Sequence, residues 1–62
     1  MSGADLLASI RGLFGQHPRA AGCTPEVIAG LLWILCFVPE PVEPFEVATC
    51  LEALDIERGE AA

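Results

Sequence analysis

The sequence has no lysine and no tyrosine, and its positive charge comes from three arginines alone. Nine aspartates and glutamates oppose them, so the net charge is −6 at pH 7. A surface this negative repels phosphate backbones and anionic lipid headgroups. We therefore expect no direct binding to nucleic acid or membranes. The charge either favours a larger protein with a basic surface as partner or only keeps an apolar chain in solution.

An apolar run long enough to cross a bilayer is also missing. Residues 27–38 would span about 18 Å as a helix, whereas the hydrocarbon core of a membrane is about 30 Å thick. The opening stretch MSGADLLASIRGLF has neither the basic start nor the long apolar centre of a secretory signal. We expect a cytoplasmic protein with free thiols at Cys23, Cys36 and Cys50.

Motifs for catalysis and metal binding are lacking as well. His17 and the three cysteines include no Cys-x-x-Cys or Cys-x-x-His pair, which would fix two zinc ligands on one turn. Nothing in the sequence orients His17 beside a cysteine nucleophile. Carrier proteins need a serine in an Asp-Ser-Leu context, whereas Ser2 and Ser9 stand in MSGA and LASI. We predict a protein that is not an enzyme and has no metal or cofactor, with cysteines that serve as small buried residues.

Apolar residues, in contrast, make up 53% of the 62-residue chain. A folded chain of this length exposes roughly 3,900 Å² and has room for one small core. The apolar surplus must pack unusually well or be covered by a second molecule. We predict one domain, residues 1–62, with a loose tail from about residue 59.

The first helix is predicted at about residues 3–14. Ser2 and Asp5 have capping-box spacing at its start, and Gly15 is a natural stop. Its core face combines apolar residues at helical spacing: Leu6, Leu7, Ile10, Leu13 and Phe14. The opposite face is the more polar one, with Asp5, Ala8, Ser9, Arg11 and Gly12.

A second helix is predicted at about residues 25–38. Thr24 is its cap, Pro25 occupies the first helical position, and Pro39 ends it. One face consists of Val27, Ile28, Leu31, Leu32 and Leu35. The other face is also apolar and consists of Ala29, Gly30, Trp33, Cys36 and Phe37. A helix that is apolar all round belongs at the centre of a bundle or in an interface.

The segment PEPVEP, residues 39–44, cannot continue a helix or a central strand and is expected to be a stiff, acidic connector. A third helix follows at about residues 44–57, with a core stripe of Val47, Cys50, Leu51 and Leu54. Together the three helices predict an all-α, compact three-helix bundle. The run VIAGLLWILCFV is also compatible with strands, but the caps and prolines at its ends favour a helix.

Acidic residues gather in the C-terminal half, where they would form a binding surface or a merely solvated face. On a projection of the third helix, Phe45 and Ile56 lie away from the core stripe, like an interface core with a charged rim. Alternatively, Phe45 folds under the connector and Ile56 lies in a frayed end. The predicted partner-binding residues are Glu40, Glu43, Phe45, Glu46, Glu52, Asp55, Ile56 and Glu57.

The apolar second helix predicts a different role, that of a small assembly subunit. Such a subunit would dimerise through Ala29, Gly30, Trp33 and Phe37, with Gly30 allowing close approach of the helices. The sequence leaves open whether the chain is a monomer or a homodimer. It also leaves open whether Trp33 belongs to the core or to an interface.

In its size, its charge and its acid-rich segment 40–60, the chain resembles the phage-encoded inhibitors of bacterial defence, including anti-CRISPR proteins. Several proteins of that class resemble nucleic acid in charge and occupy a basic groove on their target. The resemblance implies a non-catalytic inhibitor of a CRISPR effector, a nucleic-acid mimic acting in the host cytoplasm. The apolar surplus indicates that hydrophobic contact would contribute to such binding.

Overall fold

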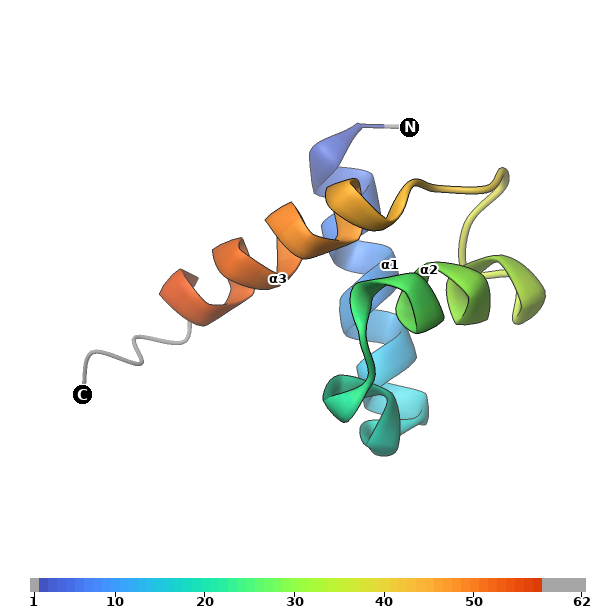
Figure 1. Cartoon of the computed structure of the whole chain (residues 1–62), viewed down its shortest axis with the longest axis horizontal. Helices are drawn as coiled ribbons and strands as arrows, with labels where there is room; N and C mark the ends of the chain where they lie inside the picture. Colours follow the sequence, from blue (N-terminus) through green and yellow to red (C-terminus); the bar gives the residue numbers. More distant parts are fainter. Residues whose placement is uncertain (1, 58–62) are drawn as a thin grey trace.

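Ser2 caps the N-terminus of the first helix. Its side-chain Oγ accepts a hydrogen bond of 3.2 Å from the backbone amide of Asp5. In the computed structural model, which describes residues 2–57 and the side chains of residues 2–55, α1 runs from Gly3–Gln16 (Figure 1). The helix passes through Gly15 and ends before Pro18, because a residue that precedes proline is driven to extended backbone. The predicted stop at Gly15 was therefore two residues early.

A short 3-10 helix, η1 at Pro18–Gly22, leads from α1 into α2 at Pro25–Ile34. Thr24 caps α2, since its hydroxyl oxygen accepts a hydrogen bond of 3.3 Å from the amide of Val27. The start of α2 is thus the predicted one.

The predicted end of this helix at residue 38 is wrong, because α2 stops at Ile34. Cys36 has a φ of 63°, the left-handed conformation that ends many helices. The amide of Phe37 then donates to the carbonyl of Leu32 (2.8 Å), and the amide of Cys36 donates to that of Trp33 (3.2 Å). These two bonds form a Schellman motif, which satisfies the last carbonyls of the helix before Pro39 is reached.

A connector containing Pro39, Pro41 and Val42, with bends at residues 37–40, returns the chain to α3 at Pro44–Glu57. The carboxylate of Glu46 reaches back and accepts a hydrogen bond of 3.0 Å from the amide of Glu43. This contact is one half of a capping box, which fixes the first turn of α3.

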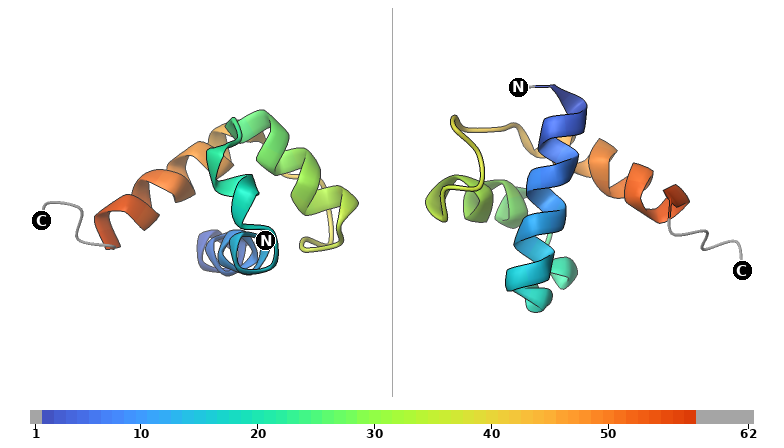
Figure 2. Two further views of the ribbon diagram at one scale, coloured as in Figure 1. Left: turned by 90° about the horizontal axis from the view of Figure 1, so that it is seen from below. Right: turned by 180° about the vertical axis from the view of Figure 1, so that it is seen from behind.

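The three helices cross rather than run alongside one another. Helices α2 and α3 cover the same side of α1 and diverge from each other, so the C-terminal end of α3 projects beyond α1 (Figures 1 and 2). The radius of gyration is 10.8 Å, against about 10.6 Å expected for a folded chain of this length. The prediction of an all-α, compact three-helix bundle is confirmed. Among the described residues, no helix is long and apolar enough to cross a membrane.

The core lies where the three helices meet. It contains Leu6, Ile10, Leu13, Ala20, Ile28, Ala29, Leu32, Val38, Val47, Cys50 and Leu54. The predicted stripes of α1 and α3 are buried or half-buried as expected. The two faces predicted for the second helix do not separate buried from exposed residues. Val27 and Leu35 are exposed although they share a face with the buried Ile28, and Ala29 is buried although it shares a face with the exposed Trp33. Cys36 is exposed rather than buried.

Candidate functional site

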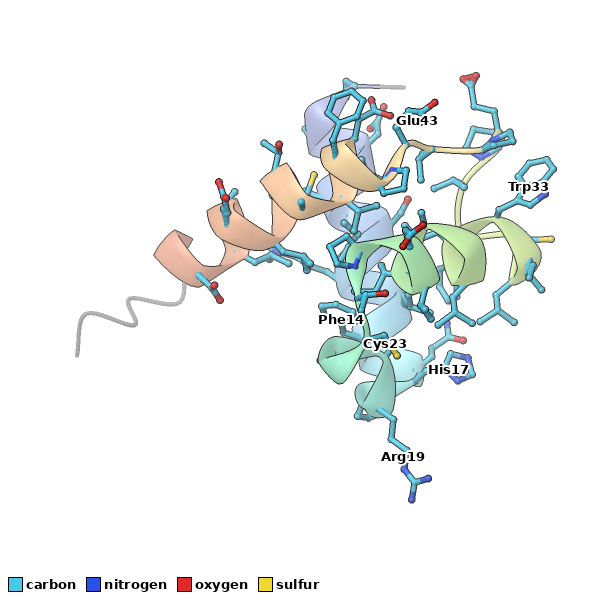
Figure 3. The ribbon with its side chains drawn as sticks, viewed as in Figure 1. Phe14, His17, Arg19, Cys23, Trp33 and Glu43 are labelled. Atoms are coloured by element: carbon cyan, nitrogen blue, oxygen red, sulfur yellow. The ribbon has the colours of Figure 1, made fainter. Side chains whose placement is uncertain are left out.

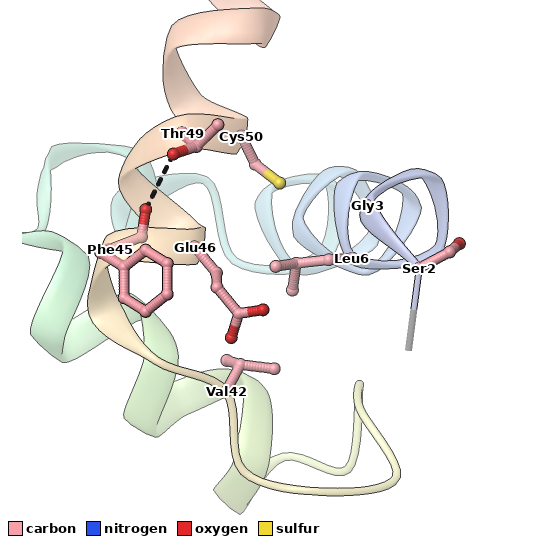
Figure 4. Close-up of a pocket in the computed structure, with 8 residues that line it drawn as sticks. All are labelled: Ser2, Gly3, Leu6, Val42, Phe45, Glu46, Thr49 and Cys50. Carbon is pink, nitrogen blue, oxygen red and sulfur yellow. Dashed lines mark hydrogen bonds between the residues drawn. The ribbon is translucent and has the colours of Figure 1, made fainter.

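Phe45 stands out in the first turn of α3, where 70% of its surface is exposed. Two residues later, Val47 is fully buried, so the helix itself is well anchored. The Phe45 ring lies at the edge of a hollow of about 230 Å³ between the first turns of α1 and α3 (Figure 4). We call it the Phe45 hollow; its lining residues are Ser2, Gly3, Leu6, Val42, Phe45, Glu46, Thr49 and Cys50.

The charge in the Phe45 hollow comes from Glu46. Its carboxylate is held by the amide of Glu43, as the fold requires at the start of α3. Burial, and secondarily the nearby Glu46 carboxylate, raise the pKa of the Cys50 thiol above its ordinary value. Cys50 therefore stays protonated near neutral pH, and it presents a neutral, weakly polar wall. An apolar floor with one carboxylate suits a group that is partly apolar and partly cationic.

The predicted partner-binding residues fall into two groups. Phe45 and Glu46 line the Phe45 hollow, and Glu40 and Glu43 lie on the neighbouring connector, where Figure 3 labels Glu43. Further along α3, the exposed Glu52 and Asp55 lie outside the hollow's lining. The side chains of Ile56 and Glu57 lie outside the described part of the structure, as do Glu60 and the tail from residue 59.

The residues of the predicted dimer face do not share one exposed surface. Ala29 is only 6% exposed and belongs to the core, whereas Trp33 is 47% exposed. Phe37 lies beyond the end of α2 and packs on α1, because a Cβ built on Gly12 would lie 3.4 Å from its ring. Gly30 is half-buried.

Ala29, Gly30 and Trp33 nevertheless meet in a second hollow, of about 280 Å³, between α2 and the connector. We call it the Trp33 hollow; its lining residues are Glu26, Ala29, Gly30, Trp33, Pro41, Val42 and Pro44. Val42 lines both hollows, so it forms the wall that they share. No sequence pattern indicates this role of Val42, since it depends on the path of the connector.

A third feature is the outer face of α2. Val27, Ile34 and Leu35 are 48%, 71% and 41% exposed, and the half-buried Leu31 lies between them. Their spacing places these four side chains on one stripe of the helix. Sequence reasoning missed this stripe because it placed Val27, Leu31 and Leu35 on one face together with Ile28 and Leu32, which are buried. The spacing of Val27, Leu31 and Ile34 was the signal available.

Side chains for metal binding are not grouped in residues 2–55, where no three His, Cys, Asp or Glu lie close enough to hold an ion. Cys23 lies between η1 and α2 and is half-buried. Its Sγ lies 3.9 Å from the carbonyl oxygen of Arg19 (Figure 3 labels both residues). Cys50 is in the core. The three thiols thus occupy separate environments.

Comparison with known proteins adds no relative to this geometry. No protein-family model matches the chain, and no curated protein sequence or solved structure matches it either.

Proposed function

We propose that the protein is a non-catalytic binding module that presents Phe45, within a rim of carboxylates, to a basic site on a larger protein. The exposure of Phe45 carries this proposal: an ordered helix turn holds 70% of a large aromatic side chain in water. Burying an aromatic side chain contributes strongly to an interface, and aromatic anchors dominate many of them.

Charge supports the same conclusion. Glu43 and Glu52 are exposed, and Glu46 lies at the base of Phe45 in the same first turn. Carboxylates around an apolar anchor would steer the protein toward a basic site, and the anchor would slow its dissociation. A basic site that normally holds nucleic acid, such as that of a CRISPR effector, would then be blocked. In this proposal the protein acts in the host cytoplasm as a competitive inhibitor.

The test uses charge reversal at positions that do not support the fold. Glu46 is unsuitable because its carboxylate caps α3. We would measure binding of the wild type and of the double variant Glu43→Lys, Glu52→Lys to a CRISPR effector, and competition with its guide RNA. The proposal predicts at least about a tenfold loss of affinity, and a weaker dependence on salt, for the variant.

Phe45→Ala probes the anchor, and Ile34→Ala is its matched control, since Ile34 is 71% exposed on another helix. We expect Phe45→Ala to weaken binding about 30-fold or more and Ile34→Ala to leave it unchanged. Circular dichroism would verify that each variant is folded. Equal affinity of Phe45→Ala and the wild type would argue against the proposal, as would binding that survives charge reversal.

A second candidate is a small assembly subunit that dimerises through α2, and the exposed stripe Val27, Leu31, Ile34 and Leu35 favours it. A second copy would cover these side chains better than the predicted set around Ala29, which is already buried. Light scattering distinguishes the two functions. A dimer that persists in high salt and dissociates in Ile34→Glu supports the assembly role, and a monomer at all concentrations removes it.

A further inference from the structure

We infer that the Trp33 hollow is a second binding pocket for the larger basic protein of the proposed function, and that it binds the side chain of an arginine or lysine from that partner. The inference rests on the proposed function, in which Phe45 provides the first point of contact. Val42 separates the Trp33 hollow from the Phe45 hollow, so a segment lying across the connector would meet both. Each hollow has a partly exposed aromatic ring on its rim.

The shape of the Trp33 hollow is suited to one side chain. At about 280 Å³ it lies at the lower end of the range for sites that enclose free organic ligands, roughly 300–1,000 Å³. Pro41 and Pro44 provide two rigid walls, and Trp33 provides a third. Trp33 lies at the edge of the molecule near the connector, with Glu43 further along the connector (Figure 3).

Gly30 keeps the hollow open. Glycine in the interior of a helix lowers helix stability relative to alanine, and packing does not require it here. A Cβ built on Gly30 would meet nothing within 4 Å, outside the helix's own backbone and its chain neighbours, so a larger side chain would extend into open space. The missing side chain thus leaves volume beside Trp33 that any other residue would reduce.

The charge of the hollow selects a cation. Glu26 is its only charged lining residue among those described, and the Phe45 hollow is likewise lined by a single carboxylate, Glu46. A tryptophan and a carboxylate that line one hollow both attract a guanidinium or ammonium group, and the aliphatic part of an arginine or lysine would cover the prolines. An acidic side chain would be repelled, and a purely apolar one would leave Glu26 desolvated.

The probe is a series of short acetylated peptides that carry two arginines separated by one to four alanines. Trp33 is the only tryptophan of the chain, so its fluorescence reports directly on the hollow. We expect one spacing to bind about tenfold or more tightly than a single-arginine peptide, with a change in Trp33 emission. Peptides with glutamate or leucine in place of arginine should not bind.

Two variants locate the binding. Gly30→Leu fills the hollow with a good helix former, and Glu26→Gln removes its charge at constant shape. Each should reduce the affinity of the best peptide to that of the single-arginine peptide. Ala8→Leu, which introduces the same leucine side chain at an exposed position of α1, is the matched control and should have no effect.

The results separate the inference from the proposed function. If Phe45→Ala and charge reversal abolish binding to the large partner while Gly30→Leu and Glu26→Gln do not, the inference is overturned and the proposed function stands. Failure of every two-arginine peptide to bind at millimolar concentration overturns the inference. Preferential binding of a leucine or proline-rich peptide overturns it too, because the hollow would then select apolar groups.

Discussion

The hydroxyl of Ser9 donates a hydrogen bond of 2.8 Å to the backbone carbonyl of Phe37, joining the middle of α1 to the turn that follows α2. Three residues further along α1, Gly12 lies against the Phe37 ring, where a Cβ would make ordinary van der Waals contact at 3.4 Å. The face of α1 that carries these two small residues was expected to be its polar side. It instead receives the end of α2, so a single turn of α1 fixes where the connector begins.

Loss of the Ser9 hydroxyl should therefore destabilise the fold. In Ser9→Ala the carbonyl of Phe37 loses its partner in a half-buried setting, and we expect the free energy of unfolding to fall by about 1 kcal/mol. Urea denaturation followed by circular dichroism measures this change. The control, Ala8→Ser, alters an exposed neighbour and should change stability by less than about 0.5 kcal/mol. An unchanged Ser9→Ala midpoint would show that the bond contributes nothing.

Cys36 should be replaceable by glycine with a gain in stability. Its φ of 63° is unfavourable for a residue with a Cβ, and glycine adopts this conformation readily. We expect Cys36→Gly to raise the free energy of unfolding by up to about 1 kcal/mol. Cys36→Ala keeps the Cβ and should give no comparable gain, so a difference between the two variants isolates the backbone effect from the loss of the thiol.

Gly30→Ala should also stabilise the protein. The new Cβ meets no neighbour, and alanine is the better helix former by roughly 0.5–1 kcal/mol. Thermal unfolding monitored at 222 nm would show a higher midpoint. A lower midpoint would mean that the fold itself requires glycine at this position, so that Gly30 would no longer indicate a binding role for the space beside Trp33.

The three thiols should react at different rates. Cys36 is exposed, Cys23 is half-buried and Cys50 is 8% exposed, so iodoacetamide should modify them in that order. We expect Cys50 to react on the order of a hundredfold more slowly than Cys36, because its modification requires local opening. Mass spectrometry of digested samples gives the three rates, and in denaturant the difference should disappear. Fast modification of native Cys50 would contradict its buried position.

Alkaline pH should weaken the fold through Cys50. Because burial raises the pKa of this thiol in the folded state, the unfolded chain loses its proton first, above about pH 8.5. The folded state then binds more protons than the unfolded one, so stability falls as pH rises from there to the raised pKa. Denaturation between pH 7 and pH 10 measures the slope. Cys50→Ala should flatten it, whereas an equal slope in that variant would assign the effect to other groups.

Sequence alone predicted the buried stripes of α1 and α3 because more polar positions separate the apolar ones in both helices, although the polar side of α1 also carries the contact with Phe37. In α2 the apolar side chains surround the helix, so periodicity could not indicate that Ala29 would be buried and Val27 exposed. The end of α2 was missed for a different reason. Helices often end on a glycine in the left-handed conformation, and here Cys36 occupies that position without any sequence signal.

Some residues of the candidate site could be predicted from the sequence, and others could not. Phe45 could be assigned to the outer side of α3 from its position relative to Val47 and Leu54, and it is exposed. Trp33 could not be assigned, because both sides of its helix are apolar. Val42 and the two hollows depend on where the connector crosses the other elements, which no local pattern encodes.

The prolines of the connector restrict how any chain can lie against it. Pro39, Pro41 and Pro44 have no amide hydrogen, and the amide of Glu43 already donates to Glu46. Apart from these, the segment has only the amides of Glu40 and Val42, so an incoming strand could not form a continuous ladder of hydrogen bonds with it. Edge-to-edge aggregation along the connector is disfavoured for the same reason. A partner must then recognise this surface through side-chain contacts and not through backbone hydrogen bonds. A single side-chain substitution in the partner would therefore be enough to change its affinity.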